Sequence, residues 1–114
     1  MNKYRVSPAA ARTMDGITFD SKAEMKRYQE LRMLERAGRV KDIELQPKYV
    51  LLEPFTYRKK KYRGITYRAD FKYFDVELGW IVEDVKGYAV DAYRIKRQLF
   101  LSQHPEITFR EVKV

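Results

Sequence analysis

Hydrophobic and polar residues alternate along residues 67–74, which is the pattern of a strand that buries one face. A second alternating segment covers residues 80–86, and the Asp and Gly residues between 75 and 79 predict a turn that joins the two. Each strand carries an aspartate, Asp70 in the first and Asp84 in the second, although Asp is depleted from strands. The expected inward positions of the first strand are Tyr67, Ala69, Phe71 and Tyr73.

A period of 3.6 residues replaces the alternation in two parts of the chain, and each predicts a helix. The first helix is expected at residues 21–37, because Asp20 or Ser21 can cap its start and Gly38 can end it. The second is expected at residues 91–103, with Asp91 as its cap. The predicted buried stripe of this second helix is Ala92, Ile95 and Leu99.

Shorter elements complete the order. Residues 45–52 predict a strand that starts at Gln46-Pro47, a place where proline is tolerated. Pro54 closes this strand, a hairpin tip is expected within 57–64, and residues 107–112 predict a final edge strand.

Together these elements predict one α+β domain over residues 1–114. Its expected architecture is an α/β sandwich, with a central mixed sheet of four or more strands flanked by two main helices. Asp15-Gly16 is a tight-turn signal for a small hairpin in front of this core. Residues 1–11 are expected to form a flexible arm.

Glu24 lies on the apolar face of the first predicted helix. Its spacing to Tyr28, Leu31 and Leu34 places the carboxyl group toward the sheet. An inward carboxylate needs a partner or a cation. The alternative is that Glu24 completes a capping box with Ser21 and has only a structural role.

The composition favours a polyanionic partner. The chain has 24 Lys and Arg against 16 Asp and Glu, a net charge of +8, and this balance is typical of proteins that bind nucleic acid or an anionic membrane. No apolar run approaches the ~20 residues of a membrane span. Without cysteine there are no thiolate metal sites, and the single histidine, His104, cannot build a histidine zinc site. No signal-peptide core is visible at the N-terminus, so we expect a cytoplasmic protein.

Two basic segments are candidate DNA contacts. The expected hairpin tip holds five cations and two tyrosines in eight residues, so phosphate binding and base stacking can combine there. The second predicted helix is also basic. The alternative for both is an ordinary solvated surface. The candidate residues are Arg58, Lys59, Lys60, Lys61, Tyr62, Arg63, Tyr93, Arg94, Lys96 and Arg97.

The two strand aspartates suggest a metal site. Carboxylates from neighbouring strands, with a backbone carbonyl at Val85, provide the oxygen ligands that Mg²⁺ prefers. Lys86 lies two residues after Asp84 and therefore on the same strand face, where its ammonium can position a water or offset phosphate charge. Gln46 is a further candidate for orienting a water or a phosphate oxygen. The alternative is that Asp70 and Asp84 form ordinary salt bridges with Arg68, Lys72 or Lys86.

The spacing of Asp70 and Asp84-Val85-Lys86 resembles the signature of the PD-(D/E)xK nuclease superfamily, with Ala69 in the place of the usual proline. The wider order of FDSKAEMKRYQEL, QP, RADF, EDVKG and a basic helix is similar to a family of small phage-type proteins related to Holliday-junction-resolving endonucleases. This similarity covers about residues 16–100.

The resemblance implies a restriction-endonuclease-like core and a Mg²⁺-dependent endodeoxyribonuclease, with Mn²⁺ as a plausible substitute. Asp70, Asp84, the Val85 carbonyl and Glu24 would hold the metal, and Lys86 would act on the water. A branched DNA substrate and a homodimer are also implied, and we expect no membrane partner and no nucleotide cofactor; a phage-encoded protein would act in the cytoplasm of its bacterial host. The alternative function is a non-catalytic basic DNA-binding accessory protein of recombination or packaging.

Overall fold

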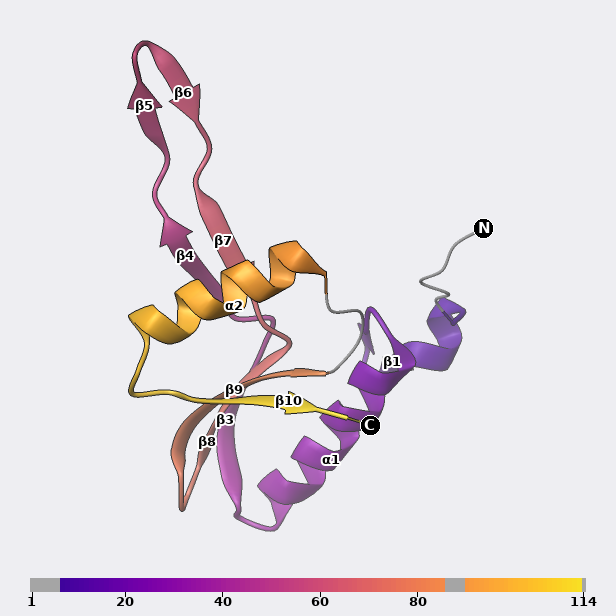
Figure 1. Ribbon diagram of the computed structural model, residues 1–114. Helices are drawn as coiled ribbons and strands as arrows, with labels where there is room; N and C mark the ends of the chain where they lie inside the picture. The colour runs from indigo at the N-terminus through magenta and orange to yellow at the C-terminus, as the bar shows by residue number, and fades with distance from the viewer. Residues whose placement is uncertain (1–6, 86–89, 114) are drawn as a thin grey trace.

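The computed structural model describes residues 7–85 and 90–113, and its central sheet has one helix on each face (Figure 1). The order in this sheet is β10 (Thr108–Val112), β9 (Gly79–Val85), β8 (Phe71–Asp75) and β3 (Val40–Leu45). Strand β9 is antiparallel to β8 and parallel to β10, so the sheet is mixed. The expected α+β class is therefore confirmed, and β10 is an edge strand as predicted.

The two main helices lie close to their predicted positions. Helix α1 (Lys22–Arg36) is capped by Ser21, whose hydroxyl accepts a hydrogen bond from the Glu24 amide at 3.1 Å. Gly38, with φ of +77°, follows the helix in the left-handed region that glycine adopts without strain. Helix α2 (Asp91–Gln103) starts after Val90, which has no capping side chain. The prediction that Asp91 is the cap is therefore wrong.

Two hydrophobic cores lie on opposite faces of the sheet. The core under α1 includes Leu31 and Ile81, and the core under α2 includes Val82 and Phe100. Ile81 and Val82 are adjacent in β9 but enter different cores, because successive strand side chains point to opposite faces. This explains why β9 is buried on both faces from Ile81 to Asp84.

Two of the predicted strands are each divided between two observed strands. The strand expected at 45–52 is interrupted at Gln46, which has a left-handed φ of +51°. Its first residue, Leu45, is the end of β3, and the rest forms β4 (Lys48–Leu52). The segment expected at 67–74 is split between β7 (Ile65–Arg68) and β8. Strand β7 pairs with β4, so the chain passes from a two-stranded ribbon into the sheet at Ala69 and Asp70.

The alternation that predicted one long strand nevertheless identified buried positions. Tyr67 and Ala69 belong to the core under α2, whereas Phe71 and Tyr73 belong to the core under α1. The change of core follows from the division between β7 and β8. A sequence period of two records burial but does not show where a chain leaves one sheet for another.

The ribbon of β4 and β7 continues into a hairpin of β5 (Phe55–Tyr57) and β6 (Lys60–Tyr62), which projects from the body (Figure 1). The expected hairpin tip is thus confirmed. It turns through Arg58 and Lys59, both with positive φ, as a two-residue hairpin loop requires. The ribbon carries this tip away from the central sheet (Figure 1).

Helix α2 presents a different face to the sheet from the one predicted. Ile95 is 58% exposed and Leu99 is 37% exposed, and Ala92 is exposed as well. Phe100 is fully buried instead and packs against the rings of Tyr49 and Tyr67. Phe100 therefore lies on the face of α2 that packs on the sheet, and the predicted aliphatic stripe lies outside that face.

The first part of the chain forms small elements. Strands β1 (Thr13–Met14) and β2 (Ile17–Thr18) confirm the hairpin around Asp15-Gly16. Residues 1–11 are expected to form a flexible arm, but the end of that range belongs to a short 3₁₀ helix, η1 (Ala9–Arg12). Residues 1–6 lie outside the described part. Within the described residues, neither helix is long and apolar enough to cross a bilayer.

Glu83 is a fully buried acid with a complete set of partners. Arg27 of α1 donates to it at 2.6 Å and 3.1 Å, and the Tyr73 hydroxyl donates at 2.5 Å. These contacts lie on the α1 face, opposite to Asp84. Glu83 is therefore not a candidate ligand for the predicted metal site.

We expect Arg27→Met to lower the free energy of unfolding by about 3–5 kcal/mol, because it leaves the Glu83 charge buried without its cation. Chemical denaturation measures the change. Arg32→Met is the matched control, since Arg32 lies on the same helix and pairs with Glu35 at the surface; it should cost less than about 1 kcal/mol. Equal losses in the two variants would contradict a structural role for the buried pair.

Candidate metal centre and nucleic-acid interface

Asp70 and Asp84 lie next to each other where the ribbon enters the sheet. The pairing of β8 with β9 matches Phe71 to Glu83, so the residues that follow in register are Asp70 and Asp84. The Asp70 amide donates to Asp84 Oδ1 at 3.0 Å, and the Val85 amide donates to Asp70 Oδ2 at 2.7 Å. The two predicted strand acids are therefore brought together, and backbone amides hold both carboxyl groups.

Glu24 reaches Asp70 from the other side, at the start of α1. It is 8% exposed and lies within hydrogen-bonding reach of the Asp70 carboxyl group. The Ser21 hydroxyl also lies 3.2 Å from Glu24 Oε2, so Glu24 takes part in the helix cap and in the acidic site at once. Glu24, Gln46 and Asp70 line a cavity of about 110 Å³, whose remaining walls are mainly hydrophobic.

Burial and like charge favour the neutral forms of the two aspartates. Burial, reinforced by the neighbouring Glu24, raises the pKa of Asp70 to about 8. Burial also raises the pKa of Asp84 to about 6, and the charge of Asp70 acts in the same direction. Among the described residues neither aspartate forms a salt bridge, so the alternative of pairs with Arg68 or Lys72 is not found. When the two aspartates ionise, these neighbours therefore supply no cation to balance their charge.

Two polar partners of the aspartates were not predicted. The buried Tyr67 hydroxyl donates to Asp84 Oδ2, and Asp20 adds to the negative charge that acts on Asp70. Tyr67 counted only as an apolar position in the strand pattern, and Asp20 only as a possible helix cap. Tyr67 is far from Asp84 along the chain, and Asp20 is far from Asp70, so no local sequence pattern could predict these contacts.

Gln46 connects the loop between β3 and β4 to the acidic site. Its backbone amide donates to the Asp70 carbonyl at 2.9 Å, and its side chain donates to Asp20 Oδ2 at 3.2 Å. The side chain therefore fixes a neighbouring carboxylate. Its predicted role in orienting a water or a phosphate remains a prediction.

The described acids do not form a complete metal cage. Within residues 7–85 and 90–113, no group of three or more Asp, Glu or His side chains is arranged to hold a metal ion. Mg²⁺ commonly binds through one or two protein carboxylates and fills its remaining positions with water and substrate phosphate. The Asp70 and Asp84 pair fits that donor set. Lys86 lies outside the described residues, and the Val85 carbonyl keeps its role only as a prediction.

The predicted DNA-binding residues of the hairpin are exposed, but some are engaged with one another. The Arg58 guanidinium lies over the Tyr57 ring, and the Lys60 ammonium lies over the Tyr62 ring. Phe55 stacks on Tyr62 with ring centroids 4.9 Å apart. Tyr62 already has neighbours that occupy its ring, which limits its use as a stacking platform. The hairpin cations Lys59, Lys61 and Arg63 are exposed.

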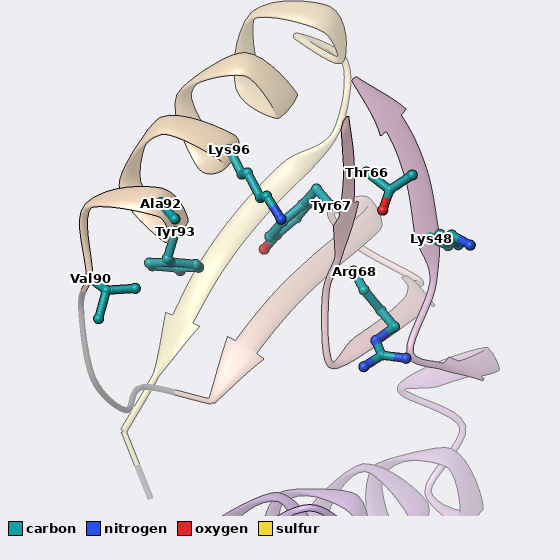
Figure 2. A pocket seen from close by; sticks show the side chains of 8 residues that line it. All are labelled: Lys48, Thr66, Tyr67, Arg68, Val90, Ala92, Tyr93 and Lys96. Carbon is teal, nitrogen blue, oxygen red and sulfur yellow. The ribbon is translucent and has the colours of Figure 1, made fainter. Parts of the chain in front are cut away.

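The basic residues of α2 differ in their surroundings. Arg97 forms an ion pair with Glu111 at 2.8 Å and covers the Tyr93 ring, and Arg94 lies 3.5 Å from Asp91. Lys96 instead faces a pocket of about 540 Å³ between α2 and β7, which we call the cationic pocket (Figure 2). Its lining residues are Lys48, Thr66, Tyr67, Arg68, Val90, Ala92, Tyr93 and Lys96.

We expect Asp70→Asn to stabilise the metal-free protein at alkaline pH. The pKa of Asp70 is raised from 3.8 to about 8 in the folded state, so the folded protein holds the Asp70 proton more tightly than the unfolded chain does. The stability that comes from protonated Asp70 is complete below pH 3.8 and is lost as the pH rises through about 8. An uncharged Asn avoids that loss, so the variant should gain on the order of 1–3 kcal/mol over wild type above pH 8. Thermal unfolding in EDTA across this pH range measures the difference.

Asp75→Asn is the control for this prediction. Two backbone amides lower the pKa of Asp75, so its charge favours the folded state and its removal should bring no gain at alkaline pH. Parallel stability curves for wild type and Asp70→Asn would show that Asp70 carries no ionisation cost.

Comparisons with known proteins give a family and no further match. No curated protein and no protein of solved structure matches the sequence. One family model, described as "Protein of unknown function (DUF1064)", matches residues 1–114. The chain therefore belongs to the DUF1064 family.

Proposed function

We propose that the protein is a Mg²⁺-dependent endodeoxyribonuclease that hydrolyses phosphodiester bonds. The observation that carries the proposal is the adjacent pair of Asp70 and the buried Asp84. Burial, followed by the charge of neighbouring carboxyl groups, raises the pKa of both, and no cation lies among their described hydrogen-bond partners. The resemblance of Asp70 and Asp84-Val85-Lys86 to the PD-(D/E)xK signature supports the same activity. The net charge of +8 favours a polyanionic substrate.

The proposed roles follow from the positions of the side chains. Asp70 and Asp84 would hold Mg²⁺, with Glu24 next to Asp70 as a further ligand or as the partner of a bound water. The metal would supply positive charge to the phosphate and lower the pKa of a bound water. Lys86 would position that water, since the nucleophile and the phosphate are both negative and repel each other.

Backbone amides prepare the site for this task. The Val85 and Asp70 amides each donate to one aspartate, so the carboxyl groups keep fixed positions before a cation arrives. Tyr67 holds the second oxygen of Asp84 in the same way. Fixed donors reduce the reorganisation that a reaction in this site would require.

The second candidate is a non-catalytic DNA-binding accessory protein of recombination or packaging. The exposed cations of the hairpin favour it, because they can bind phosphates without any contribution from the acids. Metal dependence separates the two functions: an enzyme cuts a fluorescent branched DNA with Mg²⁺ and does not cut it with EDTA.

We expect Lys86→Ala to reduce cleavage of branched DNA by about 10²–10³-fold, a loss typical of removing one transition-state stabiliser. Gel assays with Mg²⁺ or Mn²⁺ measure cleavage, and DNA affinity in EDTA should change little. Lys41→Ala is the matched control: it removes one exposed cation from the start of β3, whereas Asp70 lies near the other end of that strand. Full activity of Lys86→Ala would remove Lys86 from the mechanism.

We also propose a homodimer that acts on a branched substrate such as a Holliday junction. One chain offers one acidic site, whereas two symmetric cuts need two sites related by a two-fold axis. Sedimentation equilibrium should give twice the mass of one chain, and mapped products should contain cuts in two strands of the same junction. A monomer at every concentration that still makes paired cuts would contradict the dimer.

A further inference from the structure

The surface between α2 and β7 has a cationic part and an apolar part. The cationic part is the cationic pocket, and beside it lies a groove of about 390 Å³, which we call the apolar groove. The two share Thr66, Ala92 and Lys96, so they form one continuous surface. The apolar groove is lined by Gly64, Ile65, Thr66, Ala92, Ile95, Lys96 and Leu99.

The cations of the pocket are free to bind an anion. Within the described part of the chain, Lys48, Arg68 and Lys96 form no ion pair, and no acidic side chain lines the pocket. Figure 2 shows Lys96 extending from α2 toward Tyr67, while Arg68 extends from β7 on the other side of the opening. Figure 2 shows the Lys48 side chain directed outward on the far side of its strand, so Lys96 and Arg68 are the cations on the pocket side. Two cations without an ion pair among the described residues are suited to phosphate groups.

The apolar groove exposes side chains that a helix and a strand normally bury. Ile95 is 58% exposed, and Ile65 and Leu99 are each 37% exposed. These three residues come from both walls of the groove. A ligand that covers them must therefore present apolar surface directly beside the negative charge that the cationic pocket requires.

We propose that this surface binds an unpaired nucleic-acid strand, with phosphates in the cationic pocket and bases on the apolar groove. A duplex stacks its bases inside and presents mainly phosphates, whereas an unpaired strand exposes charge and apolar rings together. The inference rests on the proposed function, because Tyr67 links the surface to the acidic site: it lines the pocket and donates to Asp84. An unpaired strand bound here leads to the Asp70 and Asp84 pair.

Fluorescence anisotropy in EDTA tests the proposal without cleavage. The probes are a fluorescein-labelled oligothymidylate and a hairpin duplex with the same number of nucleotides. Wild type should bind the oligothymidylate more tightly. The double variant Arg68→Ala, Lys96→Ala should weaken that binding about tenfold or more and reduce its salt slope by about 1.4, since each single-strand phosphate contact contributes about 0.7.

A charge-matched double variant controls for long-range attraction. Arg36→Ala, Lys41→Ala removes two exposed cations at the end of α1 and the start of β3, neither of which lines the cationic pocket. It should weaken oligothymidylate binding by less than about threefold. Equal losses in the two double variants would overturn the proposal, because binding would then depend on net charge alone.

The apolar half has its own test. Ile95→Ser should weaken oligothymidylate binding about fivefold or more and leave the salt slope unchanged, as expected for lost contact with bases. Met33→Ser, at a position on α1 that is 61% exposed, is the matched control and should change neither. If Ile95→Ser instead alters the sedimentation mass, the groove is an interface between copies of the chain and the strand-binding proposal is wrong.

The outcomes separate this proposal from the proposed function. Equal affinity of wild type for the duplex and the oligothymidylate would overturn the preference for an unpaired strand, even if Mg²⁺-dependent cleavage is observed. Strand binding with the expected losses, in a protein that cuts no DNA, would instead support the surface and overturn the nuclease.

Discussion

Two carboxyl groups that lie side by side without a cation among their described neighbours are the central constraint on this structure. Asp70 and Asp84 occupy opposing positions where the ribbon of β4 and β7 joins the sheet, and burial raises the pKa of each. Backbone amides offset part of this cost through hydrogen bonds. Binding a divalent cation would relieve the remainder, which is why the pair is the strongest candidate for a functional site.

Glu83 shows how the same strand treats an acid that is structural. It precedes Asp84 directly, yet its carboxylate is matched by Arg27 and Tyr73 on the α1 face. The two neighbouring acids therefore differ in compensation, although both are buried. Strand alternation causes the difference, because the Glu83 side chain points toward a cation on α1 and the Asp84 side chain points toward the Tyr67 hydroxyl on the α2 side.

The arrangement of the helices connects the acidic pair to the surface around it. Helix α1 brings Glu24 to Asp70, and α2 covers Tyr67, whose hydroxyl reaches Asp84. Since α2 buries Phe100, it leaves its aliphatic stripe beside the cationic pocket. The packing of α2 through Phe100 thus places this helix over Tyr67, the hydrogen-bond donor to Asp84, and leaves Ile95 and Leu99 exposed in the apolar groove.

The amino-acid sequence by itself determined the two main helices, the α+β class and the adjacency of Asp70 and Asp84. These features depend on local periods, caps and turn residues, such as Ser21 before α1 and the Asp75 turn before β9. It also placed Glu24 on the inward face of its helix, because the position of a side chain around a helix follows from spacing alone.

Only the tertiary structure decided which of several apolar faces is buried and which distant groups meet. Ile95 and Leu99 have the spacing of a core stripe, but Phe100 is the residue of α2 that is buried against Tyr67, and the stripe is left exposed. Tyr67 and Asp84 are far apart along the chain, and no local pattern predicts their hydrogen bond. The physical reason is that the folded chain buries the combination of apolar surfaces that lowers its free energy most. A short segment of sequence shows its own apolar face but not the other faces with which it competes for burial.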